Sequence, residues 1–182
     1  GLEIAHEDLV DNIISGSWDF VNSDTDPTQP DPCSDENSCV GHGTSVAGII
    51  AAKGWNNKGV RGVAPNASVF GKNYLSNQSN TEAQAHGVNS PGNVTADIYN
   101  MSYGTGYPKD SDENQLSKYN LPQFLNRTRE LTFTNGVTQL RDGKGAIYIK
   151  SAGNYYETES VDTVCGSGLN LSNDRRIGFV IQ

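Results

Sequence analysis

The sequence predicts an α/β fold built on a parallel sheet, and two apolar segments with a helical segment between them carry this prediction. Residues 97–102 and 145–149 are rich in β-favouring side chains with few charges, as in buried strands. Residues 121–140 mix apolar and charged side chains in a broadly helical pattern, which Asn135 and Gly136 are expected to interrupt. Strands that alternate with helical crossovers form parallel sheets, and functional groups gather at the carboxyl ends of those strands.

The elements expected earlier in the chain are shorter. Residues 18–21 form a possible short strand, and residues 68–75 form an apolar strand after a glycine-punctuated turn. Residues 76–95 are polar, with two prospective turns. His86 lies there without any recognisable ligand spacing, so we expect it at the surface.

Length and composition indicate one loop-rich globular domain over residues 1–182. A chain of 182 residues can bury a sizeable core but is too short for two comfortable domains. The net charge of -8 argues against nucleic acid and anionic membranes as partners. No apolar run approaches the roughly 20 residues that span a bilayer. We therefore expect no nucleic-acid partner and no membrane partner.

The three cysteines are consistent with an oxidising compartment. Cys33 and Cys39 flank a polar loop and can close a small disulfide, which implies a secreted or extracytoplasmic protein. Cys165 then has no partner in the sequence, so it is either a free thiol or paired outside these residues.

Residues 41–52 predict a buried helix with a titratable ring at its start. Thr44 or Ser45 can cap the helix, and three apolar side chains then share one face: Val46, Ile49 and Ile50. Four small residues let another backbone pack closely: Gly43, Ala47, Gly48 and Ala51. The helix dipole at this end favours a neutral imidazole at His42, which suits a general base. The alternative is a hydrogen-bonded core histidine.

The motif decides between these alternatives, because it resembles the histidine motif of subtilisin-like serine proteases. In that family His-Gly-Thr is followed by a helix that contains Ala-Gly, as in residues 42–48 here. Three further segments match the family: residues 62–67 (Gly-Val-Ala-Pro-Asn-Ala), 100–104 (Asn-Met-Ser-Tyr-Gly) and 151–154 (Ser-Ala-Gly-Asn). The resemblance implies a three-layer parallel-sheet subtilisin-like fold. Residues 20–30 (Phe-Val-Asn-x-Asp-x-Asp-Pro-x-x-Pro) add a local likeness to the kexin and proprotein-convertase branch.

The resemblance also implies the site residues of a serine endopeptidase that forms an acyl-enzyme. His42 would be the general base, and Asn154 would donate a hydrogen bond to the oxyanion. The substrate cleft would be lined by residues from two of the matching segments: Ser102, Tyr103, Gly104, Ala152 and Gly153. Peptide or protein substrates are the expected partners, with a propeptide or inhibitor as a possible further one.

Two members of the catalytic triad are expected outside residues 1–182. Residues 1–9 match the sequence that follows the catalytic aspartate in this family, so that aspartate is expected before Gly1. The nucleophile motif Gly-Thr-Ser-x-Ala/Ser-x-Pro does not occur in the chain, so the serine is expected after Gln182. We therefore predict a partial catalytic domain, incomplete at both ends, that is inactive alone.

The same resemblance implies a structural calcium ion. The side chains of Asp8 and Asn56 would bind it, with main-chain carbonyls near Lys53, Lys58 and Val60. Oxygen ligands of this kind suit calcium. The alternative is that Asp8 caps a helix and that the asparagine belongs to an ordinary turn. The acidic segment 24–36 is either a solvated loop or a second calcium site.

Two other functions are consistent with parts of the sequence. A pseudoprotease or peptide-binding module would keep the cleft without the nucleophile. A secreted calcium-binding structural module would need only the acidic loop 24–36 and the Asp8 site. Substrate preference is open. Six acidic residues follow the two cleft motifs: Asp110, Asp112, Glu113, Glu157, Glu159 and Asp162. They either form a pocket for Lys or Arg side chains or are solvated loop charges.

Overall fold

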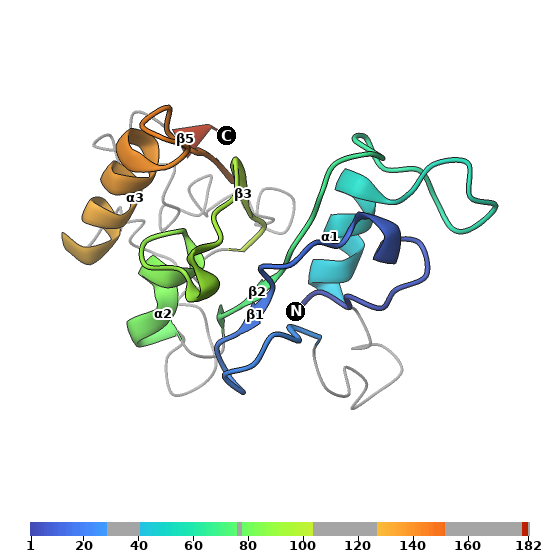
Figure 1. Cartoon of the computed structure of the whole chain (residues 1–182), viewed down its shortest axis with the longest axis horizontal. Helices are drawn as coiled ribbons and strands as arrows, with labels where there is room; N and C mark the ends of the chain where they lie inside the picture. The colour runs from blue at the N-terminus through green and yellow to red at the C-terminus, as the bar shows by residue number, and fades with distance from the viewer. Residues whose placement is uncertain (29–40, 76–77, 104–126, 152–179, 182) are drawn as a thin grey trace, which may run out of the picture. The chain divides into compact units, whose positions relative to one another are not determined.

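A computed structural model describes residues 1–28, 41–75, 78–103, 127–151 and 180–181. The chain divides into two compact units, residues 1–95 and 96–182, each of which has its own elements and core (Figure 1). The described residues of the first unit form η1 (Val10–Asn12), β1 (Trp18–Asp19), α1 (His42–Ala51), β2 (Lys72–Asn73), α2 (Gln78–Ala85) and η3 (Pro91–Asn93). Those of the second form β3 (Ile98–Met101), α3 (Arg127–Gln139), β4 (Ile147–Lys150) and β5 (Val180–Ile181). None of the helices in the described ranges is long and apolar enough to cross a membrane.

The first unit is organised around α1 and a short parallel pair of strands. Strand β1 pairs with β2 in parallel, with Trp18 opposite Lys72, and both lie within the segments predicted as strands. A small core of buried residues contains Leu2, Leu9 and Ala47. The side-chain amide of Asn12 donates to the carbonyl oxygens of Ala51 and Pro65, each at 2.8 Å. This buried amide therefore satisfies the carboxyl end of α1 and fixes the turn that follows it.

Helix α1 packs through three of its four predicted small residues, Gly43, Ala47 and Ala51, but nothing lies within 4 Å of the position a Cβ on Gly48 would take. A Cβ on Gly43 would lie 2.3 Å from the carbonyl oxygen of Gly1, so the backbone of the N-terminal segment reaches the helix only because Gly43 has no side chain. The expectation of a buried apolar face is wrong. Ile49 is 68% exposed and Ile50 37%, whereas Ala51 is fully buried, because the stripe of small residues is the face that packs against the rest of the unit.

The predicted helix cap is also wrong. Gly41 is the N-cap residue of α1, and no side chain makes a capping hydrogen bond there. The hydroxyl Oγ1 of Thr44 instead accepts a hydrogen bond of 2.9 Å from the N–H of Glu3. Thr44 therefore fastens the N-terminal segment to the helix.

The polar segment 76–95 contains helix α2, which the sequence did not predict, and His86 directly after it is buried. His86 is 3% exposed and meets the ring of Tyr74 edge-on at 5.4 Å between centroids. Its Nδ1 lies 2.7 Å from the carbonyl oxygen of Glu82, which can only accept, so this nitrogen donates. The expected surface position for His86 is therefore wrong, because a backbone carbonyl and an aromatic edge satisfy the ring inside the unit.

In its described residues, the second unit is a parallel sheet with α3 packed on one face. Its strands lie in the order β3-β4-β5, with Ile98 opposite Ile147 and Tyr148 opposite Val180. The parallel sheet and the helical crossover predicted from the sequence are confirmed. Strands β3 and β4 alternate between exposed and buried side chains, so burial of both faces is not observed: the isoleucines of β4 are about 40% exposed.

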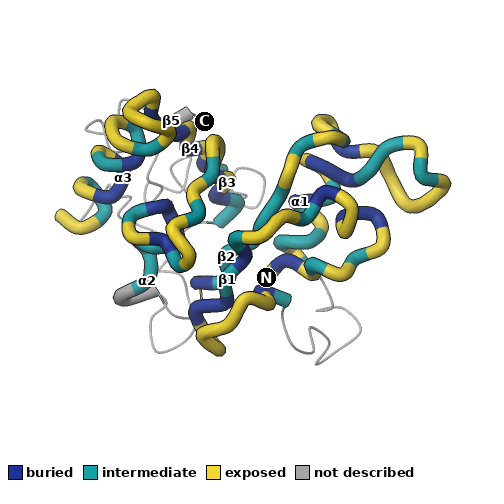
Figure 2. The backbone as a smooth tube through the Cα atoms, viewed as in Figure 1, coloured by how far each residue is buried: buried dark blue, intermediate teal, exposed yellow. Residues whose placement is uncertain are grey.

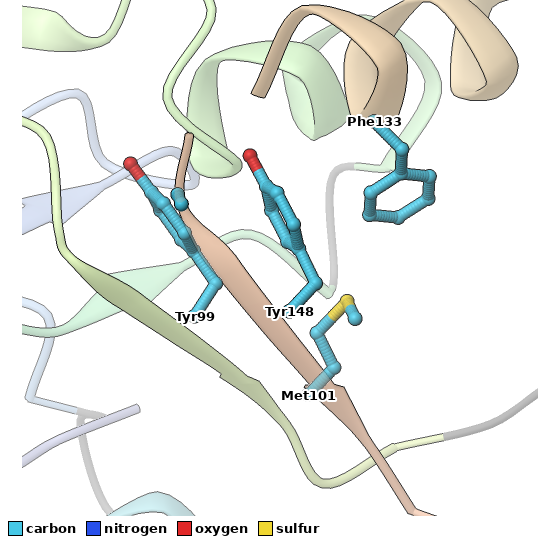
Figure 3. Packing of buried hydrophobic residues seen from close by; sticks show 5 residues of the cluster. Tyr99, Met101, Phe133 and Tyr148 are labelled. Carbon is cyan, nitrogen blue, oxygen red and sulfur yellow. The ribbon is translucent and has the colours of Figure 1, made fainter. Parts of the chain in front are cut away.

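Aromatic side chains make up the core between the sheet and α3 (Figure 3). The rings of Tyr99 and Tyr148 stack at 5.0 Å, and Phe133 meets Tyr148 edge-on at 5.1 Å. Helix α3 continues through Gly136, contrary to the predicted interruption. A Cβ at that position would lie 1.9 Å from the hydroxyl of Tyr148, so the glycine stays in the helix because it makes room for the tyrosine.

Candidate active site

The predicted general base is the first residue of α1. His42 is exposed and follows the N-cap residue Gly41, so its ring stands at the helix end where backbone N–H groups are directed outward. The main chain of Gly1 passes this turn, because Gly43 allows it and the bond from Glu3 to Thr44 holds it. The segment around Gly1 therefore lies beside the turn that carries the histidine.

The predicted substrate strand leaves the sheet at the carboxyl end of β3. The N–H of Ile147 donates to the carbonyl of Asp97 at 2.9 Å, and that of Ser151 donates to the carbonyl of Met101 at 3.2 Å. Successive residues of a strand direct their main-chain groups to opposite edges, so those of Ser102 face away from β4. No strand in the described part of the chain pairs with that edge of β3. An extended peptide can therefore add to it through main-chain hydrogen bonds.

Lys150 was not predicted as a site residue. It is 3% exposed, and its ammonium donates to the carbonyl oxygens of Tyr103 and Ser151 and to the hydroxyl of Ser151. Burial lowers the pKa of Lys150. The alternation of exposed and buried side chains along a strand could have predicted that Lys150 is buried, because it lies two residues after the buried Tyr148.

Several predicted residues lie outside the described residues. They are the substrate-binding Gly104, Ala152 and Gly153, the oxyanion donor Asn154, the three cysteines, and the acidic residues considered for substrate preference. Ser151, the first residue of the oxyanion segment 151–154, directly follows β4, so the segment begins at the carboxyl end of a parallel strand, as predicted.

The residues predicted to bind calcium come together around one carboxylate. Asp8 is 3% exposed; its Oδ1 accepts from the amide of Asn56 at 2.7 Å and its Oδ2 from the N–H of Val60 at 2.8 Å. The N–H of Lys53 donates to the carbonyl of Asp8 at 2.9 Å, and that of Lys58 donates to Oδ1 of Asn56 at 3.2 Å. The loop with Asn56 and Val60 thus folds back onto the segment that carries Asp8.

These hydrogen bonds stabilise the ionised form of the Asp8 carboxyl. The bond from Asn56, followed by that from Val60, lowers the pKa of Asp8 below its ordinary value of 3.8. The resulting contribution to stability is present above pH 3.8 and is lost as the pH falls through the lowered pKa. Among the described residues no three His, Cys, Asp or Glu side chains form a cluster able to hold a metal, so a cation here would depend on one carboxylate, the amide and main-chain carbonyls.

Comparison with known proteins identifies the family. The sequence model of the subtilase family, Peptidase S8, matches residues 1–170. The chain belongs to the subtilase family. This confirms the resemblance drawn from the histidine, strand-edge and oxyanion segments, and it accounts for the parallel α/β architecture.

Individual relatives of this subtilase chain are proteases. It is 35% identical over 158 residues to the Aeromonas extracellular serine protease of Aeromonas sobria, covering 85% of this chain and 22% of the relative. It is 37% identical over 155 residues to kexin of Saccharomyces cerevisiae, covering 85% of this chain and 17% of kexin. A crystal structure of the Aeromonas sobria serine protease with its chaperone matches 85% of this chain and 23% of that one, with a TM-score of 0.61 and 33% identity. The chain thus spans about a fifth of the length of these relatives.

Proposed function

We propose that this subtilase chain is the part of a serine endopeptidase that supplies the general base and the oxyanion donor. The observation that carries the proposal is the family match over residues 1–170, with His42 exposed at the start of α1. In this function the imidazole takes a proton from a serine hydroxyl as that serine attacks a peptide carbonyl. It later returns the proton to the leaving amine.

The aspartate and the serine of the triad come, in this proposal, from sequence that adjoins residues 1–182. The passage of Gly1 beside the first turn of α1 supports this assignment, because a carboxylate just before Gly1 can reach the imidazole and orient it. No nucleophile motif occurs in the 182 residues. Residues 1–182 alone are therefore expected to lack peptidase activity, and recovery of activity from this polypeptide would contradict the assignment.

Substrate peptides bind, in this proposal, as an added strand along Ser102, Tyr103 and Gly104. The outward direction of the Ser102 main chain supports this mode, since hydrogen bonds to the backbone hold any sequence. A preference for Lys or Arg before the scissile bond is the specificity expected of a kexin-like parent. Cleavage of a peptide series that varies this residue tests it, and equal cleavage of basic and neutral peptides would exclude it.

An assay of the full-length protein that contains this chain, with Asn154→Ala beside the wild type, tests the proposal. We expect the wild type to cleave peptides and the variant to lose about 10²–10³-fold in kcat, the loss seen when a subtilisin loses its oxyanion asparagine. Gln139→Ala is the matched control, because it also removes a side-chain amide, and Gln139 is exposed at the end of α3, where its amide donates to the neighbouring Thr138 hydroxyl at 3.3 Å. Peptide binding without turnover by the wild type would favour the pseudoprotease alternative.

An extracytoplasmic location and a folding partner extend the proposal. One relative is named as extracellular, and one similar solved structure is a complex of a serine protease with a chaperone. A secreted endopeptidase needs its activity withheld until it has folded, so we expect a propeptide, inhibitor or chaperone to accompany the full-length protein.

We also propose that the Asp8 loop binds a calcium ion. The meeting of the Asp8 carboxylate and the Asn56 side chain supports this, and rotating the Asn56 amide by 180° would present its oxygen beside the carboxylate. Removal of calcium with EGTA is expected to lower the Tm of the protein by about 5–10 °C.

The Asp8→Asn variant and a neighbouring control make this test specific. Asp8→Asn should have a low Tm that EGTA no longer changes, because the carboxylate ligand is gone. Asp11→Asn, an exposed acid three residues later, should respond to EGTA as the wild type does. If EGTA lowered the Tm of Asp8→Asn as much as that of the wild type, any bound calcium would be held by other residues.

A further inference from the structure

A lysine is buried where the two central strands of the second unit end. Lys150 is 3% exposed at the last position of β4, opposite Met101 of β3, whereas lysine is almost never fully buried unless it is paired. Burying an ammonium is costly unless its donors are satisfied. The contacts of Lys150 therefore have to account for its position.

The ammonium of Lys150 joins the two strands. Its three N–H groups match three acceptors: the carbonyl oxygen of Tyr103, the carbonyl oxygen of Ser151 at 3.2 Å and the Ser151 hydroxyl at 3.3 Å. That hydroxyl in turn lies 3.4 Å from the Tyr103 carbonyl, to which it donates. The lysine thus acts as a donor toward the serine, and its ammonium also lies 5.6 Å from the centre of the Tyr103 ring.

These contacts lie at the carboxyl ends of the two strands. Among the described residues, the bond from Ser151 to the carbonyl of Met101 is the last between the main chains of these two strands. Tyr103, two residues after β3, is the next residue whose main chain is directed toward β4, and its carbonyl accepts from the ammonium of Lys150. Lys150 therefore adds a side-chain link between the two strands beside the backbone ladder.

We propose that Lys150 is a positioning residue for the substrate strand. By holding the Tyr103 carbonyl toward β4, it keeps the main chain of Ser102 directed at the opposite edge, where no described strand pairs and where a peptide adds in the proposed function. Through Ser151 it also fixes the start of the segment that leads to Asn154. This role rests on the proposed peptidase function, because the strand edge matters only if a peptide binds there.

The kinetic test uses Lys150→Met, Lys150→Arg and the control Lys144→Met in the full-length protein. Methionine fills a similar volume without a donor, arginine keeps a charged donor, and Lys144 is exposed on the turn before β4. Each variant is titrated for active sites and assayed with a long peptide and with a single-residue amide that cannot pair along the strand. We expect Lys150→Met to lose about tenfold in kcat/KM for the long peptide, mainly through KM, and much less for the short amide. Lys150→Arg should recover most of the loss, and Lys144→Met should match the wild type.

A second measurement separates this inference from the proposed function. Amide hydrogen exchange of the same variants should be faster in Lys150→Met for peptides covering residues 101–104 and 151, and unchanged in Lys144→Met. An inactive wild type would overturn the peptidase function, and the exchange pattern would still decide whether the lysine holds the strand end. Equal loss on long and short substrates, or exchange that rises throughout the second unit, would show a general structural role and overturn the positioning role.

Discussion

Replacing His42 by alanine is expected to lower the kcat of the full-length protein for peptides by about 10⁴–10⁶-fold, the range known for loss of the base in serine proteases. Without the imidazole nothing accepts the serine proton as the nucleophile attacks, and nothing protonates the leaving amine. The side chain is exposed at the first turn of α1, so its removal should leave the fold intact. The measurement is a steady-state peptidase assay, with circular dichroism to confirm that the variant has the Tm of the wild type.

Ser45→Ala is the matched control for this variant. Ser45 is exposed on the same helix three residues later, and it belongs to α1 rather than to a nucleophile motif. The variant should keep the wild-type kcat. A His42→Ala variant within tenfold of the wild type would mean that another group is the base, and loss of activity in Ser45→Ala would contradict the assignment of the nucleophile to sequence outside these residues.

Replacing Phe133 by alanine is expected to lower the free energy of unfolding by about 3–5 kcal/mol. Phe133 is fully buried on α3, and its ring packs against Tyr148 from the middle strand of the second unit (Figure 3). Alanine would remove the ring and leave a cavity. The helix cannot move closer to the sheet to fill it, because Gly136 already lies against the hydroxyl of Tyr148. Urea unfolding followed by circular dichroism measures the change.

Leu131→Ala on the same helix provides the comparison. Leu131 is 50% exposed, so its truncation should cost less than about 1 kcal/mol, while helix propensity changes little. Similar losses for the two variants would mean that α3 does not pack on the sheet as described here.

The sequence predicted the elements correctly where the periodicity of apolar residues and the family motifs agree. Strand β3, the crossover helix and the helix that begins at His42 lie within the predicted segments, and β4 runs one residue past its predicted end at Ile149, to Lys150. The loop around Asn56 returns to Asp8, as the family resemblance implied. Such features depend on residues close together in the chain, or on motifs whose spacing is fixed by the family fold.

The errors arose where the partner of a residue is distant in sequence or is a backbone group. The role of Thr44 depends on Glu3, which is 41 positions away. His86 is buried because a carbonyl and the edge of Tyr74 satisfy it, which no pattern of ligand residues reveals. Helix α1 contains both buried and exposed residues (Figure 2). Its alanines, and not its isoleucines, face the unit's core, so hydrophobicity alone predicted the wrong face.

The sequence by itself therefore determined the family, the parallel α/β architecture and the position of His42 at a helix start, because each follows from local pattern or from a motif. Only the tertiary structure decided that Gly136 admits Tyr148, that Asp8 collects donors from a loop about 50 residues away, and that Lys150 is buried. The physical reason is the same in each case. The free energy of a buried polar or small residue depends on which distant groups satisfy it or fill the space beside it, and that pairing exists only once the chain has folded.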